Sequence, residues 1–116
     1  VGFTGVAIRY SEENDQRSMY VCWINAQQKF GCARNIRNNW TVIVEPKQSD
    51  AIIANDFNQV VLTAVGNSFA LEINDQEVAT FTDDALTRGS WGVYAENFDS
   101  AFNARYDEIA VYSLDQ

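Results

Sequence analysis

The sequence has no histidine, a single proline and two cysteines, and its hydrophobic residues, 47% of the 116, form no long run. Without histidine the chain lacks the commonest general base, the Ser–His nucleophilic systems and the usual ligand of most zinc sites. No apolar stretch approaches the ~18 residues that argue for a membrane-spanning helix. The sequence therefore predicts no transmembrane segment and argues against several classes of enzyme and against a zinc protein.

Basic residues are also scarce. Eight Lys and Arg stand against 16 Asp and Glu, which gives a formal net charge of -8. Such a chain repels a phosphate backbone and has no basic stripe with which to bind one, so we expect no nucleic-acid partner. The acidic surface has two interpretations: it keeps the protein soluble, or it attracts cations and basic partners.

The two cysteines, Cys22 and Cys32, flank a segment typical of strand, polar turn and strand. If the turn centres near residues 26–28, the sulfurs fall opposite one another on antiparallel strands, whose paired Cα atoms lie ~4.5–5.5 Å apart. The spacing favours a cross-strand disulfide, and two free buried thiols are the alternative. An exported location would support the bond.

Short runs of alternating apolar and polar residues, separated by turn residues, follow one another through the chain. Turn signals every ~8–12 residues indicate an all-β sandwich of about nine strands. Only residues 50–56 have some helical character, at best a single turn. The expected strands cover residues 2–10, 17–24, 29–35, 40–44, 58–65, 89–95 and 102–114, with a hairpin at 68–82.

The hairpin has the clearest pattern. Phe69, Leu71 and Ile73 alternate with polar or small residues, and a tight turn at residues 74–75 returns the chain to Val78. This alternation predicts a hairpin with one dry side. The residues expected in one shared core are Val60, Leu62, Phe69, Leu71, Ile73, Val78, Val93, Ile109 and Val111.

The last third of the chain also has a recognisable order of motifs: the hairpin, a Thr/Asp-rich loop, the strand Gly89-Ser-Trp-Gly-Val-Tyr and the strand Tyr106-Asp-Glu-Ile-Ala-Val. This order resembles the C-terminal half of concanavalin A-like jelly-roll domains, the laminin-G, lectin and glucanase superfold. The resemblance implies an all-β, antiparallel two-sheet jelly-roll sandwich that forms a single domain over residues 1–116.

In that superfold, further strands usually precede the strand equivalent to residues 2–10 and pair with the final strand. We therefore expect Val1 to follow N-terminal strands in a longer chain. We also expect residues 2–10 or 102–111 to pair with a strand from another segment or subunit, because an open apolar edge invites such pairing.

The resemblance implies a secreted or cell-surface module that binds glycan or acts in adhesion and has no catalytic activity. Many glycoside hydrolases of the superfold carry Glu-x-Asp-x-x-Glu on one strand, and the chain has no such string. Glu72 and Glu77 are instead expected opposite each other on the wet side of the hairpin. Two alternatives stay open: a structural accessory subunit joined to a larger assembly through its sheet edges, and the C-terminal part of a glycoside-hydrolase-like enzyme.

Sugars are held by aromatic platforms with planar polar side chains nearby, because a pyranose face is apolar while its rim carries hydroxyls. The small residues Gly5 and Ala7 leave room over one face of the sheet, for a ligand or for another packing layer. Candidate glycan-binding residues are Arg9, Arg17, Trp23, Tyr94, Asn97 and Arg105.

The tryptophans and the acidic loops allow further interpretations. Trp40 and Trp91 fall where the superfold commonly places core side chains, whereas Trp23 fits the core and the surface equally, since both faces of its strand are apolar. Related lectin and laminin-G modules bind calcium, which implies Glu96 and Asp99 as candidate ligands. Simple solvation is the alternative for these carboxylates.

Overall fold

The computed structural model describes residues 2–54, 56–97 and 110–113, with residues 93–97 and 110–113 described by their backbone. All regular secondary structure in these ranges is β-strand, and residues 50–54 form turns and a bend where one helical turn was the most that we expected. The strands are β1 (Gly2–Glu13), β2 (Gln16–Asn25), β3 (Lys29–Ile36), β4 (Asn39–Gln48), β5 (Val60–Val65), β6 (Ser68–Ile73), β7 (Gln76–Thr82), β8 (Ser90–Asn97) and β9 (Ala110–Ser113).

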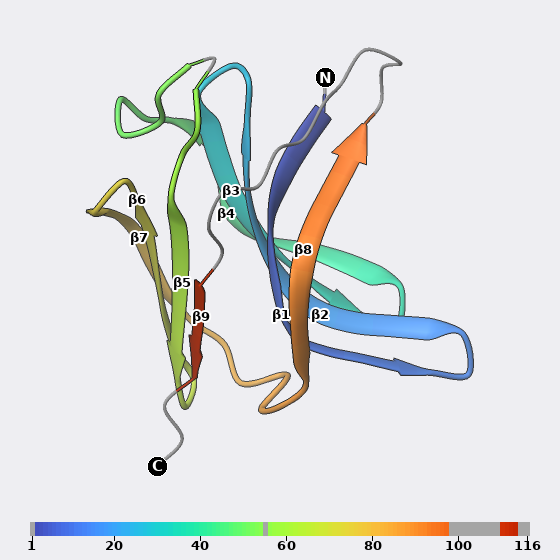
Figure 1. The fold of residues 1–116 in the computed structure, drawn as a ribbon. Helices are drawn as coiled ribbons and strands as arrows, with labels where there is room; N and C mark the ends of the chain where they lie inside the picture. Colours follow the sequence, from blue (N-terminus) through green and yellow to red (C-terminus); the bar gives the residue numbers. More distant parts are fainter. Residues whose placement is uncertain (1, 55, 98–109, 114–116) are drawn as a thin grey trace.

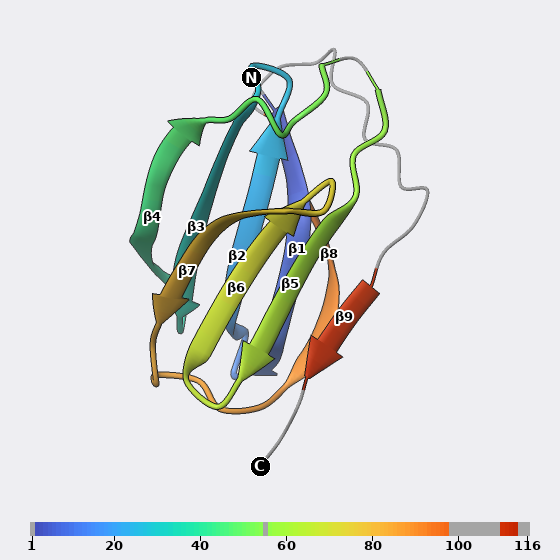
Figure 2. The same ribbon diagram turned by 90° about the vertical axis from the view of Figure 1, so that its left-hand side faces the viewer.

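The strands form two sheets that face each other (Figure 1). One sheet has five antiparallel strands in the order β4-β3-β2-β1-β8, and the other has four in the order β7-β6-β5-β9 (Figure 2). The expected all-β, two-sheet jelly-roll sandwich is confirmed. The expectation of purely antiparallel pairing is wrong at one place, because β9 runs parallel to β5. The chain passes from the first sheet to the second between β8 and β9, so no hairpin forces the two partners to be antiparallel.

β1 lies inside its sheet and pairs with β2 on one side and β8 on the other. It therefore needs no strand from another segment or subunit, contrary to one arm of the edge prediction. The other arm concerned residues 102–111, of which 102–109 lie outside the described residues. The strands expected before Val1 stay a prediction.

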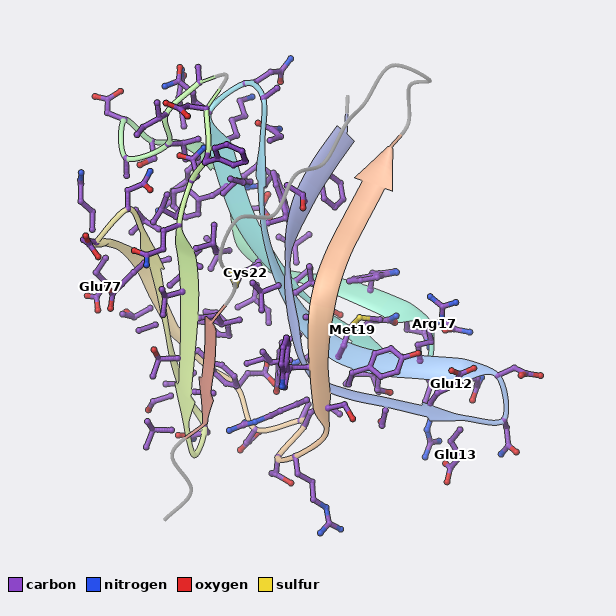
Figure 3. The ribbon with its side chains drawn as sticks, viewed as in Figure 1. Glu12, Glu13, Arg17, Met19, Cys22 and Glu77 are labelled. Atoms are coloured by element: carbon purple, nitrogen blue, oxygen red, sulfur yellow. A yellow bond between two sulfur atoms is a disulfide. The ribbon has the colours of Figure 1, made fainter. Side chains whose placement is uncertain are left out.

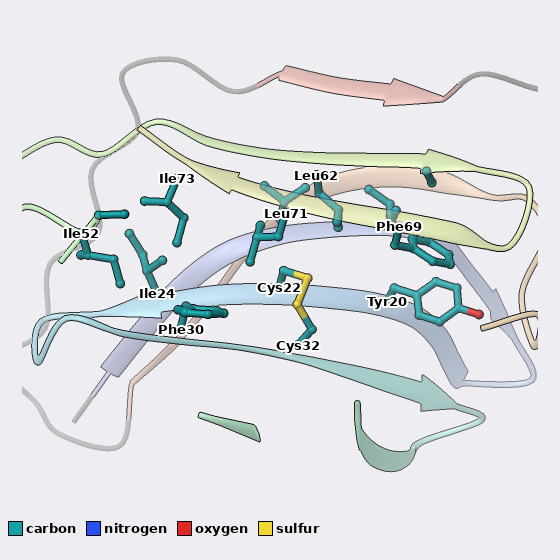
Figure 4. Packing of buried hydrophobic residues seen from close by; sticks show 14 residues of the cluster. Tyr20, Cys22, Ile24, Phe30, Cys32, Ile52, Leu62, Phe69, Leu71 and Ile73 are labelled. Carbon is teal, nitrogen blue, oxygen red and sulfur yellow. A yellow bond between two sulfur atoms is a disulfide. The ribbon is translucent and has the colours of Figure 1, made fainter. Parts of the chain in front are cut away.

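The main hydrophobic core fills the space between the sheets (Figure 4). Of the nine expected members, Leu62, Phe69, Leu71 and Ile73 are buried there, and Val60 and Val78 pack against them half-buried. The side chains of Val93, Ile109 and Val111 are outside what the structure describes. Sequence patterns did not predict Ile52, which enters this core from the connection between β4 and β5.

The predicted disulfide is confirmed. Cys22 and Cys32 are register partners on β2 and β3, their Cα atoms lie 4.1 Å apart, and their sulfurs are bonded within the core. The prediction succeeded because it depended only on a short hairpin, in which the turn position fixes the register.

Trp40 and Trp91 are not core residues: 49% of Trp40 and 59% of Trp91 is exposed. Trp40 lies on β4 and Trp91 on β8, the two edge strands of the five-stranded sheet. An edge strand has a neighbouring strand on one side only, so its large side chains are covered less completely than those of interior strands. Which strands lie at the edges depends on long-range pairing, which the local sequence does not reveal.

A β-bulge interrupts β1 at Arg9, where the backbone adopts a φ of 53° and the register with both neighbours shifts. The Arg9 side chain is buried inside the sandwich. Its Nη1 donates a hydrogen bond to the Leu86 carbonyl oxygen at 3.0 Å, and its Cζ lies 5.0 Å from the centre of the Phe69 ring. Arg9 is therefore a core-facing residue, although we had grouped it with the candidate ligand contacts.

The bulge also shapes the sheet. Bulges bend the strand that carries them, and beyond Arg9 the hairpin of β1 and β2 swings away from the second sheet (Figure 1). As a result, the face of the five-stranded sheet that is turned away from the second sheet is concave. We call it the outer face.

Candidate functional site

The residues of the outer face follow from strand alternation. Val6, Cys22 and Cys32 point into the core, so their immediate neighbours point outward. Register pairing then gives the members across the sheet: Phe3, Gly5, Ala7 and Tyr10 of β1, Arg17, Met19, Val21, Trp23 and Asn25 of β2, Gly31, Ala33 and Asn35 of β3, and Trp40 and Val42 of β4.

The centre of the outer face is apolar and closely packed. Ala7, Met19 and Val21 are only 5%, 3% and 1% exposed, and the half-buried side chains of Tyr10 and Trp23 pack against them as a second cluster. The outer side of a two-layer antiparallel sandwich is normally polar and solvated. The accessible apolar residues of this face, the half-buried Tyr10 and Trp23 and the exposed Trp40 and Val42, are therefore candidates for contact with a ligand.

Trp23 lies between two glycines, Gly5 on β1 and Gly31 on β3. A Cβ atom added to Gly31 would lie 2.7 Å from Cζ2 and 3.0 Å from Cε2 of Trp23, so the indole rests directly on this glycine. The Phe3 ring packs against it at 4.9 Å between ring centres, with a tilt of 33°. Trp23 is thus half-buried on the outer face, where its ring forms an aromatic platform. Of the two positions that the sequence left open for it, core and surface, the structure shows the surface.

Gly5 has a different role. A Cβ atom at this position would collide with the backbone of Cys22 and Trp23, so glycine permits the close approach of β1 to β2. Both glycines are register partners of Trp23, but only Gly31 makes room for its ring.

Toward the β1–β2 turn, Met19, Asn35 and Trp40 form a row across three neighbouring strands. Asn35 is 3% exposed, and its Oδ1 is buried without a hydrogen-bond partner. The row therefore has a polar acceptor between a buried Met and a half-exposed Trp. We did not predict Met19, Asn35 or Trp40 as site residues.

The polar end of the outer face holds Tyr10, Glu12 and Arg17. The Tyr10 hydroxyl donates to Glu12 Oε1 at 3.2 Å, and desolvation together with this carboxylate raises the pKa of Tyr10. Arg17 is the register partner of Glu12, and its backbone N–H is held by Asn38 Oδ1 at 3.0 Å. Figure 3 shows Met19 and Arg17 on the concave side of the bent hairpin, so Arg17 lies on the surface where we expected a polar contact.

The remaining candidates lie on β8 or beyond it. Tyr94 occupies the register position beside Gly5, while Glu96 and Asn97 pair with Phe3 and Gly2 near the strand end. Their side chains are not described, and both Asp99 and Arg105 fall outside the described residues. Among residues that are described, no group of three or more His, Cys, Asp or Glu could hold a metal ion. The calcium site with Glu96 and Asp99 stays a prediction.

On the opposite, core-facing side of the same sheet, polar groups are paired. The Tyr20 hydroxyl donates to Asp83 Oδ1 at 2.5 Å and accepts from the Leu86 N–H at 3.1 Å, and Arg34 forms a salt bridge with Asp83. Burial and the bond to Asp83 raise the pKa of Tyr20 to about 12. Partial burial alone would raise the pKa of Asp83, but hydrogen bonds from Tyr20, Ala85 and Arg34 lower it. These contacts fix the loop between β7 and β8 to the sheet.

Carboxylates on the hairpin of the second sheet follow the predicted register, with Glu72 opposite Glu77. Both belong to the second sheet and neither is part of the outer face. Within the part of the chain that the structure describes, no helix is long and apolar enough to cross a membrane.

No protein-family model matches the sequence, and no curated protein matches it either. The fold is similar to that of a carbohydrate-binding module. The solved structure of carbohydrate-binding module CBM66 from Bacillus subtilis superimposes with a TM-score of 0.67 at 18% sequence identity, over 82% of this chain and 56% of that one. At this identity the likeness shows a shared β-sandwich fold, and the chain spans little more than half the length of that module. The concanavalin A-like subclass stays a prediction.

Proposed function

We propose that this chain is a non-catalytic glycan-binding module that holds sugar on the outer face of its five-stranded sheet. The observation that carries the proposal is the Trp23 indole, which rests on Gly31, packs against Phe3 and is half-buried on a concave surface. Aromatic side chains bind the apolar face of a sugar ring, and a platform that is already held in place loses little conformational entropy on binding.

The surroundings of the platform fit the same ligand. Next to Trp23 on the sheet lie small or apolar residues, the half-buried Ala33 and the buried Ala7 and Val21, which make this part of the outer face an apolar strip. Arg17 and Tyr10 place polar atoms at the end of this apolar strip, where sugar hydroxyls need partners. The fold it shares with a carbohydrate-binding module agrees with this proposal.

The proposal includes an exported or cell-surface location. The Cys22–Cys32 disulfide supports it, because such bonds persist mainly in oxidising compartments. The lack of catalytic activity rests on the missing carboxylate string and the absence of histidine. In the described residues no feature favours either alternative, the accessory subunit or the enzyme fragment.

Affinity electrophoresis against neutral polysaccharides, among them a β-glucan, a mannan, a xylan and a galactan, tests the proposal. We expect retardation by at least one of them and a loss of roughly thirtyfold in affinity for Trp23→Ala, since truncating a Trp hot spot typically costs about 2 kcal/mol. Trp91→Ala is the matched control, because Trp91 is exposed on the edge strand β8 and alternates with the outer-face positions. Equal losses in both variants, or no binding by the wild type, would contradict the proposal.

A further inference from the structure

We propose that Asn35 is a second, polar contact point on the outer face and that its Oδ1 accepts a hydrogen bond from a hydroxyl of a neutral oligosaccharide. This inference rests on the proposed function and adds to it the feature of the ligand that the module discriminates. Within the fold itself, Asn35 Oδ1 has no hydrogen-bond partner.

Asn35 Oδ1 is buried and has no hydrogen-bond partner. In the described part of the chain, Arg34 Nε is the other buried side-chain atom in this condition, but the Arg34 guanidinium is already paired with Asp83. A buried oxygen without a partner destabilises the folded state, and native proteins contain few of them. If Asn35 served packing alone, an apolar side chain of similar size would serve better.

The neighbours of Asn35 determine how a ligand could reach its Oδ1. Its register partners are Met19 on β2, which is 3% exposed, and Trp40 on β4, which is 49% exposed. Of these two neighbours, Trp40 is the one that a ligand in solution can contact. Trp40 has a contact of its own in the fold, so a ligand that displaces the indole must also replace that contact. A ligand that shifts the Trp40 indole gains access to Asn35 Oδ1 and an aromatic wall beside it.

The chemistry of the group limits the ligand. The amide oxygen only accepts, so the ligand must offer a donor, and hydroxyls are the donors that every sugar has. The chain as a whole carries a net charge of -8, which disfavours an anionic glycan. A neutral sugar chain fits both conditions.

The distance between the two contact points indicates the length of the ligand. Trp23 pairs with Gly31, and Asn35 lies further along the same strand, β3, by the interval from 31 to 35. At ~3.3 Å per residue, the two points are ~13 Å apart along the sheet. One sugar ring cannot contact both, so the module should bind an oligosaccharide better than its monosaccharide.

The test combines isothermal titration with thermal unfolding, using the polysaccharide that the wild type binds best and its oligosaccharides from one to four units. Asn35→Leu removes the acceptor and keeps the side-chain size, Asn35→Ala removes it with less bulk, and Asn67→Leu is the control in the turn between β5 and β6. We expect both Asn35 variants to lose roughly tenfold in affinity while Asn35→Leu unfolds at the wild-type temperature or above it. Asn67→Leu should bind as the wild type does.

The outcomes separate the two proposals. Absence of glycan binding by the wild type would refute the proposed function and, with it, this inference. Binding that Asn35→Leu leaves unchanged would refute the inference alone. Parallel losses of affinity and stability in both Asn35 variants would show that Asn35 acts in the fold, which would also overturn it.

Discussion

The two faces of β2 have nearly the same hydrophobicity and different surroundings. Tyr20, Cys22 and Ile24 face the second sheet and are buried in the main core. Met19, Val21 and Trp23 alternate with them and face outward, where the side chains of Tyr10 and Trp23 cover the cluster and neither described sheet lies over it. Hydrophobicity alone therefore does not separate a packing face from a binding face.

The polar groups on the two faces do differ. On the inner side the Tyr20 hydroxyl is bonded twice and the Arg9 guanidinium is bonded to Leu86. On the outer side the oxygen of Asn35 is buried without a partner. One inner-face atom, Arg34 Nε, is also buried without a partner, but the Arg34 guanidinium is paired with Asp83 through Nη1, whereas Asn35 Oδ1 is the acceptor for which we propose a ligand partner. Each prediction below changes one face and leaves the other intact.

The largest effect is expected from removing core volume. Leu71 is fully buried opposite the five-stranded sheet, so Leu71→Ala should lower the free energy of unfolding by ~2–5 kcal/mol. Val42→Ala on the outer face should change it by less than ~0.5 kcal/mol, because Val42 is 55% exposed. Urea unfolding followed by fluorescence measures both. A near-zero effect for Leu71→Ala would place this residue at the surface.

A smaller effect on stability is expected at the inner polar cluster, in which the Tyr20 hydroxyl bonds to Asp83 and Leu86. Tyr20→Phe should lower the free energy of unfolding by ~1–3 kcal/mol, because it leaves Asp83 and the Leu86 N–H short of a partner. Binding of glycan to the outer face should be unaffected.

The same cluster predicts a pH dependence at both ends of the scale. The pKa of Tyr20 rises from 10.0 to about 12 on folding, so its contribution is present below pH 10 and is lost as the pH rises toward 12. The pKa of Asp83 is lowered from 3.8, so its contribution is present above that pH and is lost as the pH falls below it. Thermal unfolding across pH should show a larger alkaline loss in the wild type than in Tyr20→Phe, which keeps only the contribution of Tyr10. An identical alkaline profile for the two proteins would rule out this role of Tyr20.

A smaller effect on stability than at Leu71 or Tyr20 is expected at Gly31. The Cβ atom of an alanine here would displace the Trp23 ring from its contact with residue 31. The ring can move because it is partly exposed. We therefore expect Gly31→Ala to alter Trp fluorescence and weaken glycan binding several-fold, with a change of less than about 1 kcal/mol in unfolding free energy. Unchanged affinity would mean that the position of the indole on Gly31 is unimportant for binding.

Local patterns in the sequence predicted what depends on neighbours along the chain. The β6–β7 hairpin, its buried face and the Cys22–Cys32 bond all follow from alternation and turn position. The apolar residues on both sides of β2 also indicated that each face is covered or in contact with something. Gly31, opposite Trp23 in the predicted hairpin, is a further signal for a large side chain lying across the sheet.

What could not be predicted depends on pairing between distant strands. Simple alternation would place the side chains of Val6, Ile8 and Tyr10 on one side of the strand. The left-handed backbone at Arg9 shifts the register, so Val6 and Ile8 face the core and Tyr10 faces outward. Trp40 is exposed because β4 is an edge strand, and Asn35 is buried because of its cross-strand neighbours. These features appear only once the whole sheet is assembled.

The most direct test of the central claim, that the outer face is the binding surface, uses the three tryptophans as reporters. Each indole N–H gives a separate signal in a ¹⁵N–¹H NMR spectrum and can be assigned by substituting each Trp in turn. On titration with the bound oligosaccharide, we predict that the signals of Trp23 and Trp40 shift while that of Trp91 stays in place. A shift of the Trp91 signal with Trp23 unchanged would contradict the account.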